Sequence, residues 1–133
     1  MTDEGRKKII GGVKDLDVYK EAFSTAMKIY EISKTFPQEE KYSLTDQIRR
    51  SSRSIGANIA EAWQKRNYTA HFVSKLTDSD SEQAETQHWL RTAYHCEYIN
   101  NEVYSSLIDE CKHIGSMLGK MMQDAKHWCS STH

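Results

Sequence analysis

The residues from Leu44 to Trp63 carry two stripes of side chains at helical spacing. The first stripe is apolar, and its members are Leu44, Ile48, Ser51, Ile55, Ile59 and Ala62. The second stripe is polar, and its members are Gln47, Arg50, Ser54, Asn58 and Glu61. Steps of three and four place each set on one side of a helix. The pattern therefore predicts a helix near residues 43–65 with one buried side and a row of hydrogen-bonding groups beside it.

A preceding helix is predicted near residues 15–36. Asp15 is a suitable cap for its start, and Pro37 ends it because the residue before proline is pushed out of the α region. The side of this helix expected to face the interior consists of Leu16, Tyr19, Phe23, Met27 and Tyr30.

Two further helices are predicted near residues 69–99 and 101–127, with the pair Asn100-Asn101 as the turn between them. The inward steps of the third helix are Phe72, Leu76, Asp80, Gln83, Gln87, Leu90 and Tyr94, so its ends are apolar and its middle is polar. The fourth helix has an alternating three–four seam of Tyr104, Leu107, Cys111, Ile114, Leu118, Met121 and Ala125. Such a seam is typical of helices in bundles.

Four long helices joined by short connections favour antiparallel neighbours. We therefore predict an all-α fold, an antiparallel up-down-up-down four-helix bundle formed by residues 14–128. Residues 1–13 are predicted to be a mobile N-terminal tail, and residues 129–133 a C-terminal tail.

The balance of charged residues limits the classes of function that the chain can have. The 133 residues include 18 Lys and Arg against 19 Asp and Glu, which is unlike the basic balance of a strong general nucleic-acid binder. The charges are nevertheless unevenly placed. Residues 44–66 hold five basic and two acidic side chains, a net charge of +3, whereas residues 69–98 hold two basic and five acidic ones, a net charge of −3.

The three cysteines and the absence of a secretion signal indicate a reducing, cytoplasmic location rather than a disulfide scaffold. No apolar run approaches the length of a transmembrane helix, so no membrane partner is expected.

The order of several short motifs resembles the small four-helix-bundle family of 23S rRNA intervening-sequence proteins. The matching segments are Leu16-Asp17-Val18-Tyr19, Phe36-Pro37, Tyr42 with Leu44, Gln47 and Arg50, Ser54-Ile55, Asn58-Ile59-Ala60-Glu61, and Glu85 with Gln87 and Trp89-Leu90. The sequence departs from the family pattern at Ala62, where glycine is usual, and at Asp80-Ser81-Glu82, where Gly-Ser is common.

This resemblance implies a homopentamer of bundles around a central channel and no known enzymatic activity. Genes of this type occur in rRNA intervening sequences, and related, strongly basic bundles assist the reverse transcriptase of retroelements. The main functional hypothesis is a non-enzymatic homo-oligomeric interaction or scaffold protein. The alternative is an RNA- or DNA-binding accessory protein, with RNA or a nucleoprotein as its partner.

Catalytic and metal sites find no support in the spacing of candidate residues. Ser51, Ser52 and Ser54 have no His or Lys base at helical spacing on their side of the helix. The His and Cys residues lie as neighbours one or two apart, which do not face the same way on a helix. We therefore predict no catalytic residue, no metal site and no cofactor, and we read Cys111 as a small core residue.

Three sets of residues remain as candidate sites. A structural polar network that fixes helix register is proposed for Gln47, Arg50, Ser54, Asn58, Glu61, Glu82 and Glu85. Candidate nucleic-acid contacts are Arg49, Arg53, Lys65 and Arg66. Candidate subunit-interface residues are Trp63, Asp80, Gln83, Gln87 and Trp89, although the tryptophans could instead fill the corners of the bundle.

Overall fold

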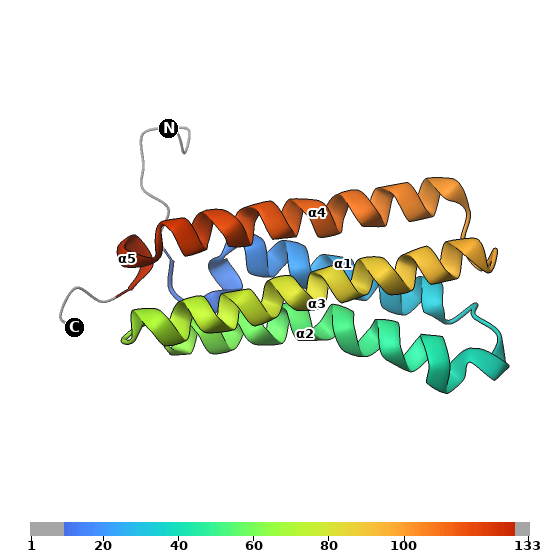
Figure 1. Ribbon diagram of the computed structural model, residues 1–133, viewed down its shortest axis with the longest axis horizontal. Helices are drawn as coiled ribbons and strands as arrows, with labels where there is room; N and C mark the ends of the chain where they lie inside the picture. Colours follow the sequence, from blue (N-terminus) through green and yellow to red (C-terminus); the bar gives the residue numbers. More distant parts are fainter. Residues whose placement is uncertain (1–9, 130–133) are drawn as a thin grey trace.

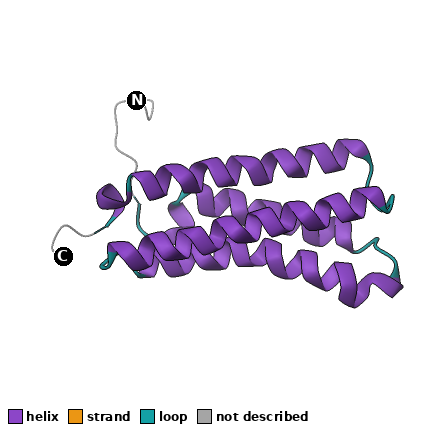
Figure 2. Cartoon of the chain, in the orientation of Figure 1, coloured by secondary structure: helices purple, strands orange, loops and turns teal. Residues whose placement is uncertain are grey.

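The computed structural model describes residues 10–129, and within that range it contains helices and connections without a strand (Figure 2). The four long helices are α1 (Asp17–Ser33), α2 (Asp46–Gln64), α3 (Thr69–His95) and α4 (Asn101–Gln123). The short elements are η2 (Val13–Asp15), η3 (Gln38–Glu40), the π-helical turn η4 (Lys41–Thr45) and α5 (Ala125–Trp128). The prediction of an all-α fold is confirmed.

The long helices lie side by side, and the chain turns back after α1, after α2 and after α3 (Figure 1). α1 contacts α2 and α4, and α3 also contacts α2 and α4, so the four helices surround one interior. No helix among residues 10–129 has the length and apolar character needed to cross a membrane.

The predicted tails lie mostly outside the described residues, since residues 1–9 and 130–133 are not described. Residues at the inner ends of both predicted tails pack on the core, namely Ile10, Val13 and Cys129. Asp15 does not cap α1 as expected. Its carboxylate accepts a 2.8 Å hydrogen bond from the Gly11 amide, so it closes the turn that precedes the helix.

The connection between α3 and α4 uses two standard helix-ending devices. At the end of α3, Glu97 adopts φ 65°, while the Tyr98 amide bonds to the Ala93 carbonyl and the Glu97 amide bonds to that of Tyr94. This is a Schellman motif, whose left-handed position usually holds glycine. The side chain of Asn100 then accepts a 2.8 Å bond from the Val103 amide and caps the start of α4.

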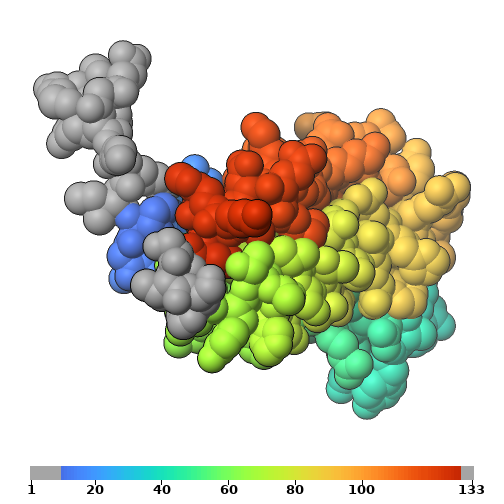
Figure 3. Space-filling model, turned by 60° about the vertical axis from the view of Figure 1, so that its left-hand side comes forward, coloured from blue at the N-terminus to red at the C-terminus, as the bar shows by residue number. Residues whose placement is uncertain are grey.

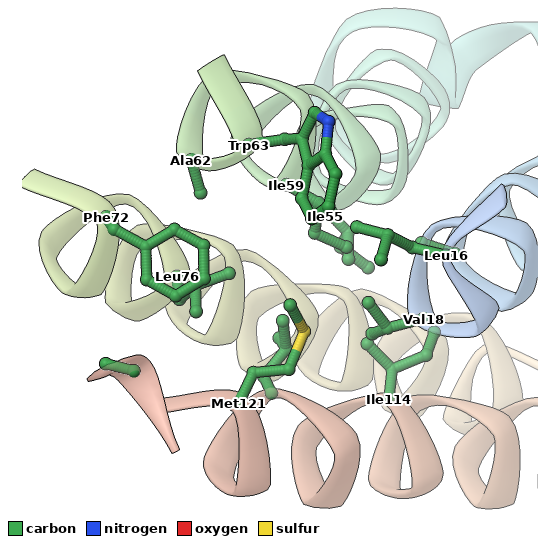
Figure 4. Close-up of a cluster of buried hydrophobic side chains, with 13 residues drawn as sticks. Leu16, Val18, Ile55, Ile59, Ala62, Trp63, Phe72, Leu76, Ile114 and Met121 are labelled. Carbon is green, nitrogen blue, oxygen red and sulfur yellow. The ribbon is translucent and has the colours of Figure 1, made fainter. Parts of the chain in front are cut away.

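The core divides into two apolar clusters along the bundle. One cluster lies toward the α2–α3 turn and includes Ile55, Ile59, Phe72, Leu76 and Ile114 (Figure 4). The other lies toward the α3–α4 turn and consists of Ile29, Phe36, Leu44, Ile48, Leu90, Ala93, Ile99, Leu107 and Cys111. The apolar stripe of α2 and the seam of α4 are inward as predicted, apart from a half-buried Tyr104.

The inward side predicted for the first helix is wrong at two positions. Phe23 is 53% exposed and Met27 is 39% exposed. The buried positions of α1 are instead Val18, Ala22, Thr25, Ala26, Ile29 and Ser33. Four of these six side chains are small (Ala22, Thr25, Ala26 and Ser33), whereas the large side chains of Phe23 and Met27 lie on the outside of the helix.

Candidate functional site

A layer of buried hydroxyl groups separates the two apolar clusters. Thr25, Ser51, Ser79 and Thr86 are all fully buried. The Ser79 hydroxyl donates to the Ile55 carbonyl at 2.8 Å, and the hydroxyls of Thr86 and Ser51 are hydrogen bonded at 2.9 Å. The Thr25 hydroxyl donates to the Glu110 carboxylate of α4 at 2.7 Å, and the Lys28 ammonium group donates to the same carboxylate at 2.8 Å. Within the described chain, no buried side-chain nitrogen or oxygen lacks a hydrogen-bond partner.

The hydroxyl layer corrects the inward seam predicted for the third helix. The buried residues of α3 are Phe72, Leu76, Ser79, Gln83, Thr86, Leu90 and Ala93. These positions alternate steps of four and three, whereas the predicted seam passed through Asp80, Gln87 and Tyr94. A strict alternation from Phe72 would have identified Ser79 and Thr86 as inward-facing.

The polar residues of the predicted α3 seam form a ladder along the contact with α4. Gln83 Nε2 donates to Asp80 Oδ1 at 3.0 Å, and Gln87 Nε2 donates to Gln83 Oε1 at 2.7 Å. A Cβ atom at Gly115 of α4 would lie 3.0 Å from Gln83 Nε2 and 3.4 Å from Asp80 Oδ1. The ladder is therefore packed against another helix of the same chain, and Gln83 is buried there.

The polar network proposed for the second stripe of α2 is not assembled. Among residues 10–129, no side-chain-to-side-chain hydrogen bond joins two of its seven members. Arg50 is exposed, Ser54 donates to the Arg50 carbonyl, and Asn58 donates to the Ser54 carbonyl. Glu61 instead pairs with Lys75 of α3 at 2.9 Å, and Glu85 accepts from Trp89 Nε1 at 3.0 Å. Gln47 is half-buried at the edge of the stripe.

An acidic face runs along α3, formed by the exposed Asp78 and Glu85 and the half-buried Glu82. Burial raises the pKa of the Glu82 carboxyl, and the neighbouring charges of Glu85 and Asp78 raise it further, while Arg50 opposes them. Lys75 lies 3.6 Å from Asp78 but is shared with Glu61. The negative charge of this face is therefore incompletely neutralised within the chain.

The four candidate nucleic-acid contacts fall into two separate pairs, one on α2 and the other just after it. The guanidinium groups of Arg49 and Arg53 lie 4.9 and 5.5 Å from the centre of the Tyr30 ring. Lys65 and Arg66 follow the other end of the helix, roughly 24 Å away at the rise of an α-helix. The four residues consequently do not form one continuous basic patch.

The tryptophans proposed for a subunit interface contact residues of their own chain. Trp63 is 8% exposed, its ring meets that of Trp128 edge-on at 6.2 Å, and the Arg66 guanidinium lies 3.6 Å from its centre. Trp63 thus fills a corner of the bundle, which was the alternative interpretation. Trp89 is half-buried against the second core cluster.

An exposed apolar groove lies between α1 and α2, and sequence reasoning missed it. Its volume is about 340 Å³, and it is lined by Tyr19, Ala22, Phe23, Ala26, Met27, Ser52, Arg53, Gly56, Ala57 and Ala60. The α2 side of the groove consists mainly of small residues, and the α1 side carries the exposed Phe23 and Met27. The available signal was the row of small residues along each helix, at positions 22 and 26 and at 56, 57 and 60.

The groups considered for catalysis or metal binding serve local structure. The hydroxyls of Ser51, Ser52 and Ser54 each donate to a backbone carbonyl three or four residues earlier. Cys111 is fully buried, and burial raises the pKa of its thiol to about 12, which keeps it protonated. Across residues 10–129, no group of three or more His, Cys, Asp or Glu side chains is arranged to hold a metal ion.

Comparison with known proteins identifies a matching family model and a similar solved structure. A family model described as 23S rRNA-intervening sequence protein matches residues 14–120. A crystal structure of a protein of unknown function from the S23 ribosomal protein family of Bacteroides thetaiotaomicron is similar, with a TM-score of 0.72 and 33% sequence identity. The similarity covers 79% of this chain and 97% of that one. No curated protein matches.

Proposed function

The chain belongs to the 23S rRNA-intervening sequence protein family, and because the similar crystal structure is of a protein of unknown function, we propose a role on the basis of the surface of this molecule. We propose that the chain is an antiparallel up-down-up-down four-helix bundle that acts in the cytosol as a non-enzymatic scaffold and associates with copies of itself. The observation that carries this proposal is the exposed groove between α1 and α2.

The groove has the composition of a protein interface. Phe23 and Met27 leave large apolar side chains in water, and interfaces are enriched in aromatic residues, Met and Arg. The small residues of α2 leave room for side chains of a partner to enter, and Arg53 supplies a cation at the edge. Burial of Phe23 and Met27 against another subunit would remove this apolar surface from water.

A second copy of the chain supplies a complementary surface. The groove side carries Arg53 with Arg49 beside it, whereas the acidic face of α3 carries Glu82 and Glu85 with incomplete neutralisation. Contact between these two different surfaces is heterologous, and heterologous contacts form closed rings when their rotation closes. A ring of five copies is the number implied by the family resemblance.

Light scattering at micromolar protein concentration tests the assembly. We expect a mass of five 15.4-kDa chains for the wild type and a smaller mass for the double variant Phe23→Asp/Met27→Asp. Tyr42→Asp is the matched control, because Tyr42 is 73% exposed but lies outside the groove. Circular dichroism checks that each variant keeps its helical content. A wild-type protein that remains a monomer would reject the proposal.

A charge exchange tests which surfaces meet. Arg53→Glu and Glu82→Arg should each weaken association, and the double variant Arg53→Glu/Glu82→Arg should restore part of it. Restoration is expected because the exchanged pair is again of opposite charge. If the loss of association in the double variant equals the sum of the losses in the two single variants, the groove meets some other surface.

Nucleic-acid binding is the second candidate function, and the pair of arginines over Tyr30 is the observation in its favour. Two guanidinium groups held over one ring present clustered positive charge of the kind that binds phosphates. A salt titration of RNA binding tests this role, because affinity through phosphate contacts falls steeply with added salt. The variant Arg49→Glu/Arg53→Glu should abolish binding, and Lys65→Glu should reduce it less.

A further inference from the structure

A small basic pocket lies where the chain passes from α1 to α2. Its volume is about 220 Å³, and it is lined by Ser33, Lys34, Phe36, Pro37, Gln38, Lys41, Thr45 and Arg49. Three of these residues are cationic and none is acidic. Figure 3 shows the start of α2 and the preceding turn, in teal, at the outer edge of the molecule.

Arg49 is held in place at this pocket by two contacts. Its Nε donates a 2.7 Å hydrogen bond to the Ser33 hydroxyl, and its guanidinium group lies over the Tyr30 ring. The Ser33 hydroxyl in turn donates to the Tyr30 carbonyl at 2.8 Å, so it is fixed as an acceptor. The bond to Ser33 uses Nε and does not consume the two terminal nitrogens, which are the atoms that bind an oxyanion in a fork.

The two lysines supply exposed positive charge. Lys41 is exposed and lies 5.3 Å from the Tyr42 ring centre. Lys34 is exposed and pairs with Glu31 at 3.0 Å, a contact that raises the pKa of the lysine and keeps it charged. An exposed pair of this kind contributes little stability, so Lys34 can turn to an incoming anion at small cost.

The carboxylate of Glu40, which is close to the pocket in sequence, has other partners. Glu40 accepts hydrogen bonds from Ser43 at 2.8 Å and from Tyr98 at 2.7 Å, and these bonds lower its pKa. The side chains of Thr45 and Gln38 add neutral polar groups to the wall, and Phe36 and Pro37 add an apolar one that strengthens electrostatic attraction.

We propose that this pocket binds a phosphate group, with Arg49 as the fixed fork and Lys34 and Lys41 as closing cations. The pocket is smaller than the roughly 300–1,000 Å³ of sites for drug-sized ligands, so it accommodates a single anionic group rather than a whole metabolite. The phosphate is that of a small phosphorylated molecule or of the 5′ end of an RNA. This site is distinct from the α1–α2 groove and does not depend on self-association.

Titration with inorganic phosphate, followed by nuclear magnetic resonance of the backbone amides, is the primary test. We expect saturable shifts confined to residues around Thr45 and Arg49. Lys34→Gln/Lys41→Gln should weaken the affinity by about tenfold or more, because it removes charged donors. Arg49→Lys keeps the charge but removes the fork, and it should also weaken binding. Lys65→Gln is the matched control on the other end of α2 and should leave the affinity unchanged.

Two RNA probes separate the sources of the phosphate. A short RNA with a 5′ phosphate that binds more tightly than the same RNA with a 5′ hydroxyl assigns the site to RNA ends. Equal behaviour of the two RNAs together with saturable inorganic phosphate binding assigns it to a small phosphorylated molecule. Shifts that do not saturate, or that persist unchanged in Lys34→Gln/Lys41→Gln, would overturn the proposal. The mass of the lysine variants in light scattering should equal that of the wild type, so failure here is separable from failure of the assembly.

Discussion

The hydroxyl of Ser79 in α3 donates a 2.8 Å hydrogen bond to the backbone carbonyl of Ile55 in α2, where both residues are fully buried. A serine can reach the backbone of another helix only when the two helices pack closely. The same pair of helices is joined again between Thr86 and Ser51. Stability therefore depends on polar contacts at the centre of the core as well as on the apolar clusters on each side.

Removal of the Thr86 hydroxyl tests this layer. Thr86→Val keeps the shape of the side chain but removes the hydrogen bond to the Ser51 hydroxyl. We expect a loss of about 1–2 kcal/mol in the free energy of unfolding. Ser51→Ala should cost a similar amount, and the double variant should cost less than the sum because each change removes the same bond. Thr77→Val, at an exposed position of α3, should change stability by less than about 0.5 kcal/mol. Strict additivity in chemical denaturation would show that the two hydroxyls are not coupled.

Two glycines of α4 form a matched pair for testing the packing of α3 against α4. Gly119→Ala meets nothing within 4 Å and should stabilise the protein by about 1 kcal/mol, because glycine is unfavourable inside a helix. Gly115→Ala places its Cβ 3.0 Å from the amide of Gln83, which is buried and bonded to both Asp80 and Gln87. This variant should lose the gain or become destabilised in thermal unfolding. An equal gain in stability at both positions would mean that the Asp80–Gln83–Gln87 ladder shifts to admit the added methyl group without cost.

The left-handed residue after α3 predicts a stabilising change. Glu97 has φ 65°, a conformation in which a Cβ atom is disfavoured. Glu97→Gly should raise the free energy of unfolding by about 1 kcal/mol, since the relief of strain exceeds the added freedom of the unfolded chain. Glu97→Ala removes the same charge but keeps the Cβ, and it should give no comparable gain. A similar gain from both variants would assign the effect to the charge.

The hydrogen bond from Tyr98 to Glu40 predicts a specific alkaline titration. It raises the pKa of the Tyr98 hydroxyl to about 12. Because the folded pKa lies above the unfolded value of about 10, the contribution to stability is complete below pH 10 and is lost as the pH rises to about 12. The ultraviolet absorbance of tyrosinate should show one late-titrating group that Tyr98→Phe removes. Glu40→Gln should move the pKa of Tyr98 back toward its ordinary value, and an unchanged titration would show that the carboxylate is not responsible.

Large aliphatic residues made the inward sides of α2 and α4 predictable, whereas small residues at inward positions made the inward sides of α1 and α3 hard to identify. The interior of the bundle is the one low-energy environment for Ile48, Ile55 and Ile59, so their spacing identified the inward side of α2. In α1 the buried positions include Ala22 and Ala26, whereas Phe23, which its spacing had placed on the inward side, is 53% exposed.

The candidate site was less predictable for a related reason. Exposure of Phe23 and the shape of the basic pocket depend on how α1 is rotated, which the sequence pattern left undetermined. Arg50 illustrates the same limit. Its place beside the apolar stripe suggested a member of a structural polar network, yet it is exposed, so Arg50→Ala should change stability by less than about 0.5 kcal/mol.

The hydroxyl layer also determines which alignment of helices the chain can adopt. The inward positions of α3 repeat every seven residues, so a purely aliphatic seam would tolerate a slide of one heptad, about 10.5 Å, along α2. Such a slide would bring either Phe72 or Thr86 to the place of Ser79, and either Ser79 or Ala93 to the place of Thr86. In the first case a bulky ring would enter the hydroxyl layer, and in the second Ser51 would face a methyl group. Two short polar side chains thereby exclude the shifted bundles that apolar packing alone would permit.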